Sequence, residues 1–98
     1  MGFETFVRFE KNPVDPRPYA PGEFLRGLEP SLVCTGEGLV FEYRVDATDP
    51  WPAVVISIEA DGFLVCENDR RVGARLLGPL VQFAVGHAKD ERVTVESA

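Results

Sequence analysis

The clearest structural signal in the chain is the segment AVVISIEADGFLVCE, residues 53–67. Residues 53–59 are β-branched and apolar enough for a central strand, and residues 63–67 suit the strand that follows. The intervening residues end in an Asp-Gly step, which supplies the positive φ that a tight hairpin turn needs. The segment therefore predicts a β-hairpin.

Downstream of the hairpin, apolar residues recur at helical spacing. Asp69 stands where an N-cap is needed, so we expect a helix over residues 70–87. Pro79 removes one hydrogen bond of this helix, which predicts a kink there or two helices that meet. Residues 92–96 follow as a short strand or a frayed tail.

Upstream of the hairpin, alternating hydropathy indicates strands, and a cluster of prolines indicates an extended connector. A proline in the first turn favours a short helix. These segments are a strand at 3–10, a proline-rich connector at 12–21, a helix at 21–28, and strands at 31–35 and 39–45 that can pair across residues 36–38.

Together these segments predict a single α+β domain spanning residues 1–98. We expect an antiparallel sheet of four to six strands, covered on one face by the C-terminal helix and accompanied by a short N-terminal helix. An open sheet has unpaired edges, so the 3–10 strand or the 92–96 segment could join two copies of the chain into a homodimer.

Length and composition exclude several classes of protein. Ninety-eight residues are too few for a two-domain enzyme or a full dinucleotide-binding fold. No apolar run approaches the roughly 18 residues of a membrane span, and no secretion signal is visible, so we expect a cytoplasmic protein. The formal net charge of −6 argues against direct binding to nucleic acid or to an anionic membrane.

The residue types used in catalysis and metal binding form no recognisable pattern. Cys34 and Cys66 belong to no CxxC pair and His87 is the only histidine, so we expect no metal site and no cofactor. We interpret the cysteines as buried reduced thiols, with a cross-strand disulfide as the alternative. His87 is interpreted as a helix-end residue at the edge of the core. No nucleophile elbow occurs, and we expect the protein not to be an enzyme.

Negative charge is concentrated in the middle of the chain. Residues 29–69 hold nine of the sixteen acidic residues but only one of the ten basic ones. In the predicted meander, the 46–52 loop and residues 67–69 emerge at the same end of the sheet. The cluster expected at that end comprises Trp51, Asp46, Asp49, Glu67 and Asp69.

Trp51, the only tryptophan, stands between two prolines in a stiff loop. It could plug the end of the core, or it could be exposed as a binding anchor that loses little entropy when a partner docks. Carboxylates around an exposed indole would steer a basic protein toward it. The leading hypothesis is a small acidic, non-catalytic binding module, such as an immunity or inhibitor protein that blocks a basic toxin or nuclease.

The alternative hypothesis is a small subunit that binds an anionic ligand. Guanidinium groups suit phosphates and carboxylates, and three arginines open the predicted C-terminal helix: Arg70, Arg71 and Arg75. The plainer interpretation of this polar run is an ordinary helix start whose arginines face water.

Overall fold

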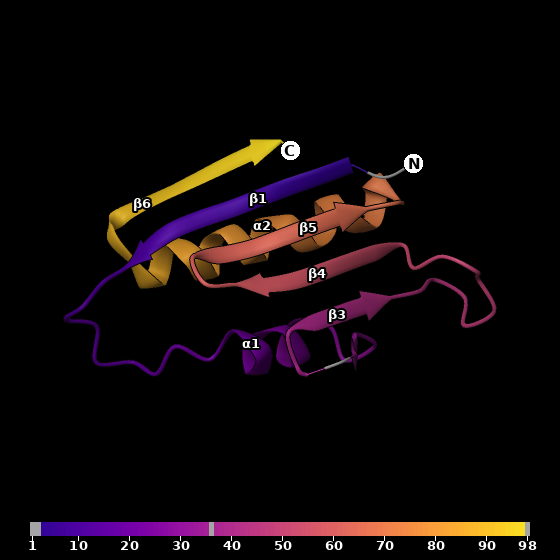
Figure 1. Ribbon diagram of the computed structural model, residues 1–98, viewed down its shortest axis with the longest axis horizontal. Helices are drawn as coiled ribbons and strands as arrows, with labels where there is room; N and C mark the ends of the chain where they lie inside the picture. Colours follow the sequence, from indigo (N-terminus) through magenta and orange to yellow (C-terminus); the bar gives the residue numbers. More distant parts are fainter. Residues whose placement is uncertain (1–2, 36, 98) are drawn as a thin grey trace.

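The computed structural model describes residues 3–35 and 37–97, and it has the predicted α+β architecture (Figure 1). A six-stranded antiparallel sheet has the strand order β2-β3-β4-β5-β1-β6. Gly36, the first residue of the predicted 36–38 turn, lies outside the described residues. In chain order the elements are β1 (Phe3–Lys11), α1 (Pro21–Leu28), β2 (Val33–Thr35), β3 (Val40–Tyr43), β4 (Val54–Glu59), β5 (Gly62–Glu67), α2 (Arg70–His87) and β6 (Ala88–Ser97).

The predicted hairpin forms the centre of this sheet. β4 and β5 pair with Ile56 opposite Val65, and the turn between them ends at Gly62, whose φ is +147°. β1 passes so close to this glycine that an added Cβ would overlap the carbonyl oxygen of Val7 and lie 2.9 Å from its carbonyl carbon. Glycine is therefore required at position 62 both for the turn and for the approach of β1.

The N-terminal strand is an interior strand of the sheet. β1 lies between β5 and β6, so the expectation that residues 3–10 could form a sheet edge is wrong. The two edges are β2 and β6, and the tail around residues 92–96 is a strand within β6. Pairing between the two ends of the chain depends on long-range contacts, which local hydropathy does not reveal.

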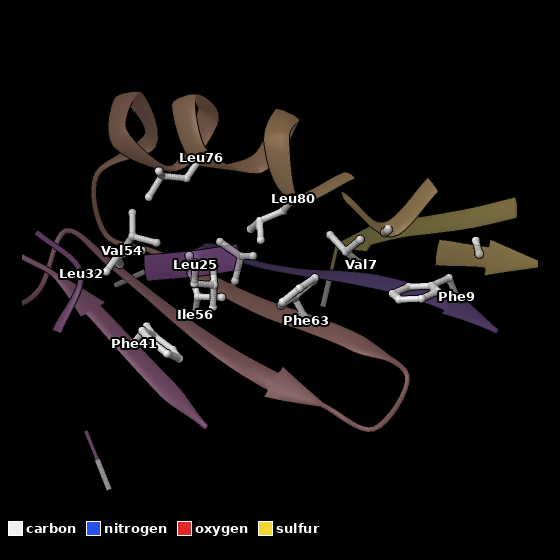
Figure 2. Packing of buried hydrophobic residues seen from close by; sticks show 13 residues of the cluster. Val7, Phe9, Leu25, Leu32, Phe41, Val54, Ile56, Phe63, Leu76 and Leu80 are labelled. Carbon is white, nitrogen blue, oxygen red and sulfur yellow. The ribbon is translucent and has the colours of Figure 1, made fainter. Parts of the chain in front are cut away.

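The two helices and one face of the sheet enclose the hydrophobic core (Figure 2). Most of the core is supplied by strand residues on the face toward the helices, and burial of one large apolar side chain contributes about 1.5–3 kcal/mol. α2 adds Leu76, Leu80 and Ala84 to this core, and α1 adds Leu25. The buried strand residues are Val7, Phe9, Phe41, Val54, Ile56, Phe63 and Val65.

The long helix α2 begins and ends where the sequence predicted. Its N-cap is Asp69, whose side chain accepts hydrogen bonds from the backbone N–H groups of Arg71 and Val72. α2 continues through Pro79 as one element, so the alternative of two separate helices is wrong. Buried leucines on both sides of the proline hold the two halves against the same sheet, and the kink at Pro79 stays a prediction.

The proline-rich connector between β1 and α1 is held against the C-terminal end of α2. Asp15 accepts two hydrogen bonds from the Arg17 guanidinium, each 3.0 Å, and its Oδ2 lies 3.3 Å from Nδ1 of His87. The hydrogen bonds from Arg17 lower the pKa of Asp15 to about 2. His87 also packs on the ring of Phe83, with the centroids 4.6 Å apart, which confirms its place at the edge of the core.

The two cysteines face opposite sides of the sheet. Cys34 on β2 lies opposite the buried Phe41, whereas Cys66 on β5 lies on the other face, and β3 and β4 separate their strands. Both are free and half-buried, so the disulfide alternative is wrong and the thiols are less buried than expected. Partial burial and the nearby charge of Glu4 raise the pKa of the Cys66 thiol.

Candidate protein-binding site

The connection between β3 and β4, residues 44–53, projects beyond the end of the sheet (Figure 1). It carries Trp51, whose side chain is among the exposed large apolar groups with 75% of its surface accessible. Of the two interpretations open for this residue, the core plug is wrong. Pro52 and Ala53, which follow it, are buried.

Hydrogen bonds within this loop hold its acidic part in one conformation. Oδ1 of Asp46 accepts from the backbone N–H and the hydroxyl of Thr48, at 3.0 and 2.9 Å. Oδ2 of Asp49 accepts from the backbone N–H of Asp46 at 3.2 Å, and the N–H of Asp49 returns a bond to the Asp46 carbonyl at 2.9 Å. The bonds from Thr48 lower the pKa of Asp46, which favours the charged form of its carboxylate.

The base of the loop is tied to the sheet and to the start of α2. Ala53 donates its N–H to the Tyr43 carbonyl at 2.7 Å, and its own carbonyl accepts from the N–H groups of Asn68 and Asp69. The side-chain amide of Asn68 donates to the Pro52 carbonyl at 2.9 Å. Residues 67–69 thus lie beside the loop, as the sequence predicted, and they anchor it.

The five residues predicted to form the cluster separate into two groups. Trp51, Asp46 and Asp49 share the projecting loop and are exposed. Glu67 is only 7% exposed and faces the helix side of the sheet, while Asp69 is occupied as the N-cap of α2. Side chains along a strand alternate between its two faces, so Glu67 lies on the same face as the buried core residues of β5.

Buried Glu67 is enclosed by the start of α2. A Cβ added at Gly73 would lie 2.7 Å from Oε2 of Glu67 and closer still to two of its side-chain carbon atoms, so the absence of a side chain at Gly73 leaves room for the Glu67 carboxylate. Glu67 also lines a groove of about 440 Å³ together with Phe3, Thr5 and Arg70. We therefore assign Glu67 to the packing between β5 and α2 and remove it from the exposed acidic cluster.

Two other carboxylates lie at this end of the sheet, and the sequence reasoning missed them. A row of paired residues crosses the outer face, which is the side away from the helices: Glu4 on β1, Cys66 on β5, Val55 on β4 and Glu42 on β3. Glu42 forms an ion pair with Arg44, with 2.9 Å between Oε2 and Nη1, whereas Glu4 is exposed. The strand alternation already assigned Glu4 and Glu42 to this face, but only the register puts them in one row.

The outer face of the sheet also carries apolar side chains. Phe6, Leu64, Val55 and Val40 lie there and are half-buried by their neighbours on the strands. Within the described part of the chain no helix covers them. The sequence indicates this apolar patch, because β4 and β5 carry apolar residues on both of their faces. This is unusual for a sheet with one face in water.

The three arginines of the alternative hypothesis do not converge. The Arg70 guanidinium lies over the ring of Phe3 on β1, 4.6 Å from its centroid, and that of Arg75 lies 5.5 Å from the ring centroid of Tyr43, at the end of β3. β4 and β5 separate these two strands, so the groups point to opposite flanks of the sheet. Arg71 is exposed between them. A small anion could not be held by all three.

Comparison of the chain with protein-family models, with curated proteins and with solved structures gives no match. Within residues 3–35 and 37–97, no three His, Cys, Asp or Glu side chains are grouped so that they could hold a metal ion. Over the same residues, no helix combines the length and hydropathy needed to cross a membrane.

Proposed function

We propose that this protein is a small acidic, non-catalytic module that binds a basic protein through the loop of residues 44–53. The exposed indole of Trp51 carries the proposal, because it projects into solvent from a loop whose base is held by backbone hydrogen bonds. Trp is the residue type most enriched at binding hot spots, where its removal costs about 2 kcal/mol or more.

The hydrogen bonds of the loop favour tight docking. In the free protein, Asp46 is already hydrogen-bonded to Asp49 and to Thr48, and Asn68 is hydrogen-bonded to Pro52 at the base of the loop. A loop that is ordered beforehand has little conformational entropy to lose on binding. When a partner covers the Trp51 indole, most of the free energy gained by burying it would therefore contribute to the affinity.

The charges of the loop favour a basic partner. The single cation, Arg44, is compensated by Glu42 and donates its Nε–H to the Asp49 carbonyl. Asp46 and Asp49 remain without an opposite charge from the loop itself. Such a pair attracts a cationic surface at long range and speeds its approach more than it strengthens the final complex.

We further propose that docking blocks the partner, in the manner of an immunity or inhibitor protein. A projecting loop with an aromatic group and adjacent carboxylates matches a cleft lined with lysine and arginine. Clefts of that kind bind the phosphates of nucleic acid in nucleases and related toxins. The loop would place its carboxylates where the phosphates bind.

The proposal is tested by capture and then by affinity. Immobilised protein is exposed to lysate at about 50 mM and about 500 mM salt, since ionic screening separates charge-driven contacts from others. Captured proteins are identified, purified and titrated against the wild type, Trp51→Ala and Asp46→Asn/Asp49→Asn. We expect a basic partner whose Kd rises at least about tenfold with Trp51→Ala, and whose association slows in the double variant.

Two matched controls separate this site from general surface effects. Val14→Ala removes an apolar side chain on the proline-rich connector that is 82% exposed, and Glu10→Gln removes a negative charge near the C-terminal end of β1. Both should leave the Kd unchanged. The proposal fails if no basic partner is captured, or if Trp51→Ala, the double variant and salt all leave binding unaltered. A bound partner whose enzymatic activity persists would refute the inhibitory role alone.

A further inference from the structure

The edge strand β6 has a free side. β1 pairs with one side of it over Val93–Ser97, and no described strand pairs with the other. Before this regular part, Asp90 and Glu91 both have a φ of 57° and the register against β1 shifts between Phe9 and Lys11. The backbone groups on the free side of β6 can therefore accept another strand.

The side chains of this edge alternate in a self-complementary way. Thr94 lies opposite Arg8 and Glu96 opposite Phe6, which places both on the outer face of the sheet, and by the same alternation Arg92 belongs to that face. Val93 and Val95 lie on the helix face, and Val95 is 48% exposed. One end of the row is thus basic, its middle neutral and its other end acidic.

We propose that β6 pairs antiparallel with β6 of a second copy of this chain, with Thr94 on the two-fold axis. In this register Arg92 of each copy faces Glu96 of the other, and Thr94 faces its own counterpart. On the opposite face, Val93 of each copy meets Val95 of the other. A two-fold contact of this kind is isologous and closes on itself, so it yields a dimer with one continuous twelve-stranded sheet.

Neighbouring registers lose these contacts. An axis at Val95 places Glu96 opposite Thr94 and Val93 opposite Ser97, so that no cross-strand ion pair forms. An axis at Val93 places Arg92 opposite Thr94 and brings Glu96 toward Asp90. Since opposite charges across a strand pair stabilise it and like charges destabilise it, the Thr94 register is preferred.

Two features of the structure favour a second copy as the occupant. Charge complementarity is reciprocal, because the same strand supplies both the cation, Arg92, and the anion, Glu96. The other edge, β2, has only three residues and offers a much shorter ladder. The contact is limited to about six residues of each chain, so we expect a weak dimer with a Kd in the micromolar range.

The test uses the full chain in sedimentation velocity from about 5 to about 500 µM, a range that brackets a micromolar Kd. We expect a reversible monomer–dimer equilibrium. Arg92→Glu alone and Glu96→Arg alone should each weaken the dimer at least about tenfold, because both cross-strand pairs become repulsive. An equimolar mixture of the two variants should form a heterodimer, since every pair then joins opposite charges.

The mixture of the two variants separates loss of the dimer contact from misfolding, because only folded variants can form the heterodimer. Circular dichroism checks that each variant is folded. Trp51→Ala is the control that should leave dimerisation unchanged, since its loop lies elsewhere on the sheet. A monomer throughout the range would overturn the proposal. So would a dimer insensitive to the charge reversals, a mixture that stays monomeric, or growth beyond the dimer.

Discussion

Replacement of Gly62 by alanine tests the central packing of the sheet. Two costs add at this position. A side chain at φ +147° occupies a region open almost only to glycine, which costs about 1–3 kcal/mol. The new Cβ would also overlap the backbone of Val7, and relief requires β1 to move away from β5, a cost of about 1–3 kcal/mol for an overpacked site. Together they predict a loss of about 2–6 kcal/mol.

That loss is large beside the roughly 5–15 kcal/mol by which a domain of this size is stable. Urea unfolding followed by circular dichroism should show the midpoint of Gly62→Ala lowered by at least about 1 M, or a chain unfolded without urea. Gly27→Ala is the matched control. Its Cβ would meet no atom within 4 Å in α1, and alanine in a helix gains about 0.5–1 kcal/mol over glycine.

A midpoint for Gly62→Ala within about 0.3 M of the wild type would refute this reasoning, since that corresponds to less than about 1 kcal/mol. It would mean that β1 does not approach the hairpin turn as closely as the structure has it.

Further substitutions test the cap, the connector and the loop. Asp69→Ala should lower the unfolding free energy by about 1 kcal/mol, because two N–H groups of α2 lose their acceptor, and Asp69→Asn should restore most of it. For Asp15, hydrogen bonds from Arg17 lower the pKa from 3.8 to about 2, so its stabilising effect is complete above about pH 4 and is lost as the pH falls toward 2. Urea midpoints of the wild type and Asp15→Asn should differ at about pH 5 and converge at about pH 2; a gap that persists in acid contradicts the assignment. Trp51→Ala should change stability by less than about 0.5 kcal/mol, and a larger loss in thermal unfolding would show that the indole packs on the fold.

Much of the local structure could be predicted because its signals are local. The Asp-Gly turn, the cap at Asp69 and the helical spacing after it located β4, β5 and α2 to within about a residue. Alternation along β1 correctly separated Val7 from Arg8. Pro79 does not divide the C-terminal helix in two, because both halves pack on one sheet and α2 stays a single element.

The candidate site could be predicted only in part, because a residue's exposure depends on which elements cover it. The sequence by itself determined that Trp51, Asp46 and Asp49 share one loop, since they are neighbours in the chain. Whether the indole closed the core or faced solvent was decided by tertiary structure, in which Pro52 and Ala53 are buried and Trp51 is exposed. The burial of Glu67 depends likewise on the close passage of α2.

The sequence alone determined the elements and the predominance of negative charge, because periodicity, caps and composition are properties of neighbouring residues. Only the tertiary structure decided the strand order, which places β1 inside the sheet and β6 at its edge. The backbone groups of any strand can pair with those of any other. The choice of neighbour therefore follows from how side chains pack between segments distant in the chain, and that choice decides which surfaces stay open for a partner.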